Sequence, residues 1–462
     1  MTTESANSAN LMGIAPGEVK KSEIAGHAIA GTGQNLIFGL WTSYMLVFFT
    51  DVFGIAGGVA GLIMLITRVQ DALTDPIMGV IADRTRTRWG RYRPWLLFMS
   101  VPVALMLILN FSAPDFGPAG KIAYAAVVYM LMSVVYSLVD VPYWTLPAAM
   151  TSSVSKRTTI FSVSRTSTTL SSVIVGIIVI PLVTFFGGEN MARGFFFTAL
   201  VVGSAGATLY LIGFSLIREH ISPPAPEKFS FKKLASVVIT NRPLILIILA
   251  MIIAFSTFFL RNTMMIYYVQ YNMGSIDLMP LFMFLTLPGM VIGMLLSTFA
   301  VKKLGGKSVF IYSCIAGGVI NLIFFFAGYA NQTLVMTFFV LANIPGGMVM
   351  VLVSSLIANT IEYAEWKTGS RNEGLISSFQ TFSAKAVMAI SGGLSGLMLA
   401  IVAYVPADVQ PPEVLSMFHM TMSLFPAICM LLGVIPMLFY ELTDKRHAEI
   451  VEELNKRREA NK

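Results

Sequence analysis

The chain of 462 residues contains 56% hydrophobic and only 12% charged residues, and its mean hydropathy is +0.75. Because a soluble protein of this length carries about 25% charged residues, the composition excludes a soluble globular fold and indicates a polytopic membrane protein. The net charge of +7 does not indicate a nucleic-acid partner, since most of the 31 lysines and arginines fall in alternate loops and the two tails. That asymmetry is the positive-inside pattern, and it predicts that both termini lie in the cytoplasm.

Hydropathy predicts an all-α membrane fold, because at roughly 20 apolar residues per span the length suits about twelve transmembrane helices. We place the first six spans near 24–49, 57–83, 94–112, 120–148, 158–187 and 192–217, and the second six near 243–271, 277–301, 308–328, 333–361, 374–404 and 415–440. A polar, Pro-rich segment separates the two sets and is expected to be a cytoplasmic linker. The predicted organisation is therefore an N-terminal six-helix bundle (1–217), the linker (218–242), a C-terminal six-helix bundle (243–440) and a cytoplasmic tail (441–462).

The second predicted span contains charged residues, which are unexpected in a membrane-spanning helix. Arg68, Asp71 and Asp75 fall within about 60° of one another on a helix with 100° per residue, and each charge in hydrocarbon costs about 2.5–3.5 kcal/mol on insertion scales. Two carboxylates one turn apart can share a proton or bind a small cation. We therefore predict a cation site at Asp71 and Asp75, completed by Thr74 and by Ser137 of the fourth span, with Arg68 holding the unloaded pair. A structural ion pair between two helices is the alternative.

The loop after the second span begins Gly79-Val-Ile-Ala-Asp-Arg and continues into a basic run that ends at Arg93. A shorter basic counterpart, 302–307, follows the eighth span. The Gly-x-x-x-Asp-Arg pattern between spans two and three resembles the signature of the major facilitator superfamily, in which two six-helix bundles move around a midplane site. A basic patch that anchors the loop at the membrane surface is the alternative.

Asp140 and Trp144 of the fourth span are one helical turn apart, so a carboxylate and an indole share one face. Sugars bind to this combination, because the carboxylate accepts from two hydroxyls and the aromatic ring covers the C–H face. A core tryptophan with a hydrogen bond inside the bundle is an equal alternative.

Three cations lie inside other predicted spans. Together with Arg68, Arg165 and Lys385 would nearly balance the three acids in a midplane cavity, as expected where unpaired buried charge is expensive. Arg165 or Lys385 could instead be a structural counter-ion. Arg261, in span seven, is a natural partner for a substrate carboxylate or sulfonate, and snorkelling of its side chain toward the outer surface is the alternative.

Mixed charges follow the tenth span. We expect Glu362, Glu365, Arg371 and Glu373 to form a cytoplasmic gate by pairing with the loop that starts at Asp83 and Arg84. Such ion pairs are individually weak and easily exchanged, which suits a gate. An ordinary solvated loop is the alternative.

Together these residues resemble the glycoside–pentoside–hexuronide:cation symporter family, and the matching pieces span nearly the whole chain in the right order. They are Arg68, Asp71, Asp75-Pro76, Asp140, Trp144, Lys156-Arg157, Arg165, Glu362-Tyr363, Glu365, Arg371, Glu373, Gln380-Thr381 and Lys385. The resemblance implies a cation at Asp71 and Asp75 and a sugar pocket lined by Asp140, Trp144, Arg165, Gln380, Thr381 and Lys385.

Two positions depart from the family pattern. Thr74 stands where the family has an asparagine ligand for the cation. Asn35, preceded by Gln34 in place of a lysine, stands where a first-helix aspartate grips sugar hydroxyls. An amide both donates and accepts but carries no charge, so Asn35 is expected to make a weaker or different sugar contact.

The predicted function is import of a sugar, glycoside or sugar acid in symport with Na⁺ or H⁺, Li⁺ being a further candidate, across the bacterial inner membrane by alternating access. The alternative is a proton-coupled major-facilitator exporter of a metabolite or drug. An enzyme is not expected, because the chain has no histidine cluster, no Ser/His/Asp constellation in a soluble domain and no phosphate-binding glycine loop. The expected partners are the sugar, the coupling cation and the lipid bilayer, with no cofactor.

Overall fold

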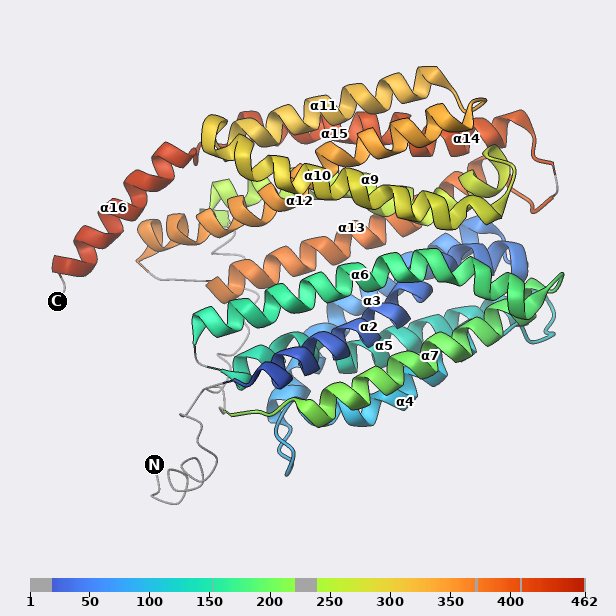
Figure 1. The fold of residues 1–462 in the computed structure, drawn as a ribbon, viewed down its shortest axis with the longest axis horizontal. Coiled ribbons are helices and arrows are strands. Elements are labelled where there is room, and N and C mark those ends of the chain that lie inside the picture. The colour runs from blue at the N-terminus through green and yellow to red at the C-terminus, as the bar shows by residue number, and fades with distance from the viewer. Residues whose placement is uncertain (1–18, 152, 221–238, 370–372, 408, 461–462) are drawn as a thin grey trace. The chain divides into compact units, whose positions relative to one another are not determined.

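The computed structural model describes residues 19–460 except 152, 221–238, 370–372 and 408. Within these residues the chain is helical throughout, apart from loops and one isolated bridge between Thr87 and Gly90. The helices of the first half are α2 (Lys21–Val47, continued by the π-helical turn Phe48–Val52), α3 (Gly57–Arg84), α4 (Arg93–Asn110), α5 (Pro118–Met150), α6 (Val154–Gly187) and α7 (Met191–Leu216) (Figure 1).

The second half begins with α9 (Arg242–Tyr267), which is continued by a π-helical turn (Tyr268–Asn272) and a short 3₁₀ turn (Ile276–Leu278). The helices that follow are α10 (Met279–Leu304), α11 (Gly306–Ala327), α12 (Gln332–Thr368), α13 (Glu373–Ile401), α14 (Pro412–Met422), α15 (Leu424–Leu438) and α16 (Asp444–Ala460). The all-α membrane fold is confirmed.

Polar side chains set where several helices begin. Ser153, Asn190, Asn241 and Asn331 each occupy the N-cap of a helix and accept a hydrogen bond from the backbone N–H three residues on. Such caps satisfy donors that have no partner within the helix and contribute about 1 kcal/mol each. At the other end of α12, Gly369 adopts the left-handed conformation (φ 72°, ψ 0°) that ends a helix and that glycine adopts without strain.

The chain divides into two compact units: Met1–Ile55 with Val69–Glu227, and Ala56–Arg68 with Lys228–Lys462. In the first unit α2 packs on α6 and α7, and α4 packs on α5 and α7. Helices α2 and α7 approach closely, since a Cβ on Gly33 would lie 2.6 Å from the carbonyl oxygen of Gly206. Fully buried aromatic rings, among them Trp41, Tyr44 and Phe48, fill the interior.

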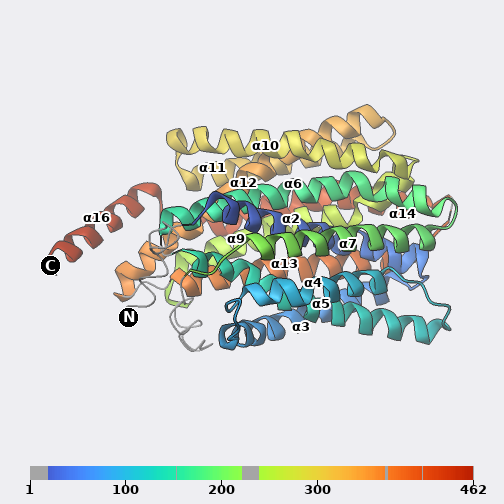
Figure 2. The same ribbon diagram turned by 60° about the horizontal axis from the view of Figure 1, so that its bottom comes forward.

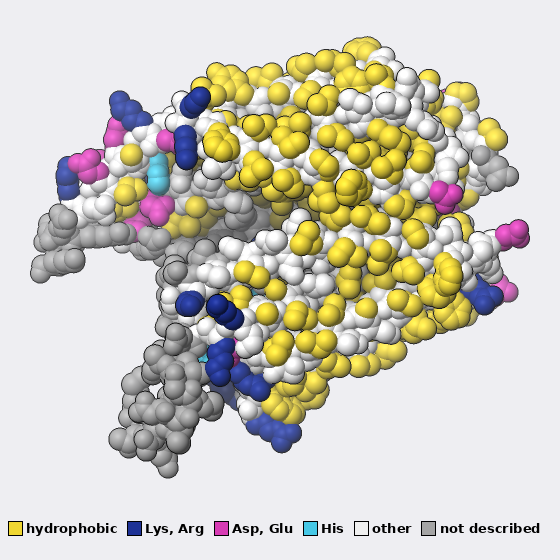
Figure 3. All heavy atoms as spheres, in the orientation of Figure 1, with side chains coloured by type: hydrophobic (Ala, Val, Ile, Leu, Met, Phe, Trp, Pro, Cys, Tyr) yellow, Lys and Arg dark blue, Asp and Glu magenta, His cyan; other side chains and the backbone are white. Residues whose placement is uncertain are grey.

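In the second unit α9, α11, α12 and α15 surround a hydrophobic core that includes Leu244, Ile247, Phe310 and Leu352. The flanks of the helices are covered by exposed large hydrophobic side chains, whereas charged groups gather near the helix ends on the face shown in Figure 3. That distribution is the one a lipid environment requires.

The structure adds detail to the predicted elements. The twelfth span, predicted near 415–440, is found as Pro412–Leu438, and its helix is interrupted at Ser423 between α14 and α15. The tenth continues to Thr368 in place of 361. The tail beyond 441 contains a 17-residue helix, α16, which projects beyond the other helices of the second unit (Figure 2).

The second predicted span, α3, is less apolar than the others. In the part of the chain that the structure describes, eleven helical segments are long and apolar enough to cross a membrane, with α14 and α15 counted together as one, and α3 is not among them. Its 28 residues are sufficient to span, but Arg68, Asp71 and Asp75 in its middle lower its hydropathy.

Candidate functional site

The two carboxylates of α3 are bonded to α5. The Ser133 hydroxyl donates to Oδ1 of Asp71, and the Ser137 hydroxyl donates to Oδ1 of Asp75 over 2.7 Å. Both pairs join residues 62 apart, so two parallel helices meet in register, one turn after another. Asp71 is buried at 3% exposure, and Asp75 is half-buried.

This arrangement concentrates oxygen atoms. Two carboxylates and two hydroxyls meet between the helices, and the Thr74 hydroxyl lies 3.5 Å from the backbone oxygen of Asp71. Small hard cations are bound by such oxygen sets, and closely spaced carboxylates also favour uptake of a proton. Ser133 was not among the predicted residues; its position four residues before Ser137 is the signal that indicates it. The role expected of Arg68, which is half-buried, stays a prediction.

Asp140 of α5 is held by donors from two directions. The Gln34 amide of α2 and the Trp144 indole N–H both donate to its Oδ1, the latter over 3.1 Å. The Arg165 guanidinium of α6 lies 4.1 Å from the centroid of the Trp144 ring, a cation–π contact. Asp140 and Trp144 are half-buried, and Arg165 is exposed.

Further polar contacts connect α2 with α6. The Ser172 hydroxyl donates to Oδ1 of Asn35 over 3.0 Å, and the hydroxyls of Thr32 and Ser167 are 2.9 Å apart. The structure thus brings Asn35, Asp140, Trp144 and Arg165 of the prediction into one three-helix region. The sequence prediction did not assign a role to Gln34, whose Oε1 is buried without a hydrogen-bond partner within the described residues.

Both groups of residues are carried by one stripe of α5. Ser133, Ser137, Asp140 and Trp144 are spaced four, three and four residues apart, so they fall within about 60° around the helix. The serines that bond to the carboxylate pair and the Asp140–Trp144 pair therefore lie on the same face of α5.

In the second unit, Arg261 is buried at 8% exposure. Its Nη2 donates to Oδ1 of Asn321 over 2.5 Å and to the backbone oxygen of Met422 over 2.6 Å, at the break between α14 and α15. The Phe339 ring lies beside it, 5.5 Å from Cζ to centroid. The structure thus shows internal partners for this guanidinium, and its predicted contact with a substrate stays a prediction.

The remaining predicted sugar residues lie on α13: Gln380 and Lys385 are half-buried, and Thr381 is exposed. Their predicted roles are not tested by contacts within the second unit.

The predicted gate residues fall into two groups. Arg371 and the side chains of Asp83 and Glu373 lie outside the described residues, and Arg84 is exposed. Glu362 and Glu365 are half-buried on α12, and Glu362 lies 3.7 Å from Nε2 of His447 on α16.

The tail helix α16 packs on the end of α12. The Trp366 indole donates to Glu453 over 2.6 Å, and Ile450 and Leu454 of α16 are buried. The sequence prediction treated this segment only as a tail; the spacing of Ile450 and Leu454, one turn apart, is the signal for a helix with a buried face.

Glu219, just after α7, organises the loop between α3 and α4. Its carboxylate accepts the backbone N–H groups of Arg91, Tyr92 and Arg93, each over 2.8 Å, at the start of α4. A carboxylate is stabilised at this position by the free N–H groups and dipole of the helix. Glu219 lies in the stretch predicted to be the cytoplasmic linker (218–242).

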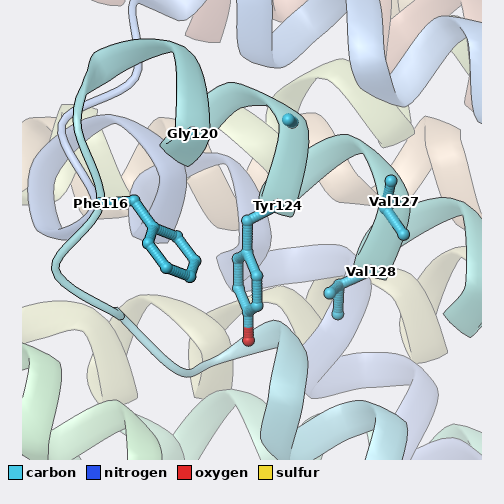
Figure 4. Close-up of a pocket in the computed structure, with 6 residues that line it drawn as sticks. Phe116, Gly120, Tyr124, Val127 and Val128 are labelled. Carbon is cyan, nitrogen blue, oxygen red and sulfur yellow. The ribbon is translucent and has the colours of Figure 1, made fainter.

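A surface hollow of about 420 Å³ lies at the start of α5 and is lined by Phe116, Gly120, Ala123, Tyr124, Val127 and Val128 (Figure 4). The Tyr124 hydroxyl donates to the backbone oxygen of Leu109 over 2.8 Å. This apolar lining does not suit a polyhydroxylated solute.

Comparison with known proteins identifies the family of the chain. The model of the family described as MFS/sugar transport protein matches residues 26–444. The chain is 30% identical to the "Glucuronide carrier protein homolog" of Escherichia coli (strain K12) over 437 residues, covering 94% of this chain and 95% of that protein. It is 29% identical to the "Isoprimeverose transporter" of Lactiplantibacillus pentosus over 440 residues, covering 94% and 91%.

Among solved structures, a bacterial homologue of the human lysosomal transporter Spinster, in an inward-facing and unoccupied conformation, matches with a TM-score of 0.67 at 12% identity. The match covers 94% of this chain and 99% of that one, and supports the fold alone. The chain is thus a membrane transporter and not an enzyme, and the resemblance inferred from its residues is confirmed: it belongs to the MFS/sugar transport family, among the glycoside, pentoside and hexuronide symporters.

Proposed function

We propose that the protein imports a sugar or glycoside together with a monovalent cation, Na⁺ or H⁺, across the bacterial inner membrane by alternating access, with both termini in the cytoplasm. The observation that carries the proposal is the stripe on α5, where Ser133 and Ser137 contact the carboxylate pair and Asp140 and Trp144 follow on the same face.

The cation site consists of Asp71 and Asp75 with the hydroxyls of Ser133, Ser137 and Thr74. In the structure the two serines donate to the carboxylates. When Na⁺ loads, these hydroxyls turn their lone pairs toward the ion, so the same oxygens serve the empty and the loaded site. When H⁺ is the coupling ion, one carboxylate takes the proton and relieves the repulsion between the pair.

The sugar site is centred on Asp140. Its carboxylate, oriented by Gln34 and Trp144, accepts hydroxyls of the sugar, and the Trp144 indole contacts the C–H face of the ring. Arg165 is the partner for a carboxylate where the cargo is a sugar acid. Gln380, Thr381 and Lys385 of α13 are the proposed contribution of the second unit.

Coupling follows from the shared helix. Neutralising Asp71 and Asp75 changes the bonds that Ser133 and Ser137 make, and α5 transmits this change to Asp140. By reciprocity, each ligand then raises the affinity for the other by the same factor. One positive charge that crosses 100 mV contributes about 2.3 kcal/mol to accumulation of the solute.

The test is uptake by proteoliposomes with an imposed Na⁺ or pH gradient, comparing neutral glycosides with glucuronides. Asp75→Cys is expected to abolish cation-driven accumulation while leaving exchange of pre-loaded sugar measurable. Asp115→Cys, which alters an exposed aspartate in the α4–α5 loop, is the matched control and should accumulate normally. Full accumulation by Asp75→Cys, or cargo movement opposite in direction to the ion, would contradict symport.

A further inference from the structure

His27 of α2 is fully buried and bonds to two other helices. Its Nδ1 lies 2.6 Å from the Ser164 hydroxyl of α6, and its Nε2 lies 3.1 Å from the backbone oxygen of Tyr143 of α5. His27 precedes Gln34 by seven residues, two helical turns, so both lie on the face of α2 that meets α5.

The chemistry of the two partners orients the ring. A backbone carbonyl only accepts, so Nε2 carries a proton and donates to Tyr143. In the neutral imidazole Nδ1 is then the acceptor, and the Ser164 hydroxyl donates to it. Tyr143 makes two further contacts with His27. Its ring stacks on the imidazole with 4.3 Å between centroids, and its hydroxyl donates to the His27 backbone oxygen over 3.1 Å.

The room for this packing comes from Gly31, one turn after His27. A Cβ at Gly31 would collide with the Tyr143 hydroxyl. The His27–Tyr143–Ser164 contact is therefore a close-fitting junction of three helices.

Both partners of His27 directly precede proposed sugar-binding residues. Tyr143 is followed by Trp144, and Ser164 is followed by Arg165. The rings of Tyr143 and Trp144 are in edge contact at 4.9 Å, and the Arg165 guanidinium lies over the Trp144 ring at 4.1 Å. One imidazole thus bonds to α5 next to the indole and to α6 next to the guanidinium.

We propose that His27 is a positioning residue of the sugar site, which holds Trp144 and Arg165 at stacking distance by bonding to Tyr143 and Ser164. The proposal rests on the proposed function and deepens it, since it names what sets the geometry of the sugar pocket. His27 acts through these neighbours and does not itself contact the cation site, whose carboxylates bond to Ser133 and Ser137.

The test separates positioning from general stability by three readouts on purified protein: the Kd for a glycoside, the Kd for Na⁺, and fluorescence of Trp144. For the fluorescence, Trp41, Trp89, Trp95 and Trp366 are replaced by phenylalanine, which leaves Trp144 as the single reporter. The matched control is Asn110→Leu, which removes another buried link between helices, α4 and α5, through the backbone oxygen of Val128 at 3.3 Å.

His27→Leu is expected to raise the glycoside Kd about tenfold or more, because two buried partners lose their hydrogen bonds. Its Na⁺ Kd should stay unchanged, and Trp144 should become more accessible to acrylamide. His27→Asn keeps an amide near the Nδ1 position and His27→Gln near the Nε2 position, so each should restore part of the affinity. Asn110→Leu should lower stability and leave both Kd values and the Trp144 signal as in the wild type.

The proposal is overturned if His27→Leu binds glycoside and reports Trp144 quenching like the wild type, or if Asn110→Leu raises the glycoside Kd equally. If His27→Leu does not fold, the glycoside Kd, the Na⁺ Kd and the Trp144 fluorescence of His27→Gln and Ser164→Ala are compared with those of the wild type, and the same criteria apply. If the wild type binds no glycoside at all, the proposed function fails, while a changed Trp144 signal in His27→Leu still supports the positioning role.

Discussion

In the first unit, the carboxylates of Asp71, Asp75 and Asp140 accept from side-chain donors, whereas Arg261, a buried cation of the second unit, is bonded at a helix break. Asp71 and Asp75 accept from serine hydroxyls, and Asp140 accepts from an amide and an indole. Arg261 donates to a buried amide oxygen and to the backbone oxygen of Met422.

The partners of the first unit can be replaced by a ligand, whereas the contacts of Arg261 stabilise the fold. Hydroxyl and amide donors turn with little cost, so a cation or a sugar hydroxyl can replace them. A backbone oxygen at a helix break cannot move away without breaking the helix end, and a guanidinium that satisfies it is a structural link. We therefore expect substitutions in the first unit to change ligand affinity and substitution of Arg261 to change stability.

The largest effect is expected from Asp140→Asn. A charge-assisted hydrogen bond contributes about 1.5–3 kcal/mol, so loss of the carboxylate should raise the sugar Kd about 100-fold. The Na⁺ Kd should change only by the coupling factor. Separate isothermal titrations with glycoside and with Na⁺ measure the two Kd values, with Asp277→Asn, an exposed aspartate of the second unit, as the control. If Asp140→Asn binds the sugar with the affinity of the wild type, Asp140 is not part of the sugar site.

Arg261→Lys tests the structural role that we expect for Arg261 in the second unit. A lysine cannot bond to Asn321 and the Met422 oxygen with one planar group, and leaving a buried acceptor unpaired costs about 1–3 kcal/mol. Thermal unfolding in detergent should show this loss, with little change for Arg242→Lys, whose pairing with Glu441 is exposed. Stability like that of the wild type together with selective loss of glucuronide binding would instead make Arg261 a ligand group.

Ser133→Ala and Ser137→Ala should act on cation binding directly, and on sugar binding only through the coupling between the two sites. Loss of one neutral hydroxyl should weaken Na⁺ binding by about 1 kcal/mol, so the Na⁺ concentration for half-maximal uptake should rise about fivefold. Ser100→Ala, which removes a buried hydroxyl that donates to the backbone oxygen of Leu97, is the control. An equal change in Ser100→Ala would show that the effect is not local to the carboxylates.

The smallest effect is expected at α16. Trp366→Phe removes the indole donor to Glu453, a half-buried contact, and should increase deuterium uptake over residues 444–460 severalfold while transport continues. Glu452→Gln is the control, because its pairing with Lys456 at 2.6 Å is exposed on α16 itself. Unchanged exchange in Trp366→Phe would mean that Ile450 and Leu454 alone hold the helix.

The amino-acid sequence alone was sufficient to predict the class of the protein, which is confirmed, and to name candidate ligand-binding residues, which stay a prediction. Span lengths, the charged stripe of α3 and the Asp140–Trp144 spacing are local properties, set by a period of 3.6 residues and by the cost of charge in lipid. The family pattern follows from the same residues and was confirmed by the comparisons.

Which side chains contact one another depends on the tertiary structure. Ser133 as partner of Asp71, Gln34 as partner of Asp140, and His27 between Tyr143 and Ser164 are contacts between residues 62 or more positions apart. Such contacts depend on how each helix is rotated and how closely glycines let it approach its neighbour, and neither is encoded in one helix's own periodicity. The break at Ser423 and the docking of α16 were missed for the same reason, since packing of the second unit stabilises both.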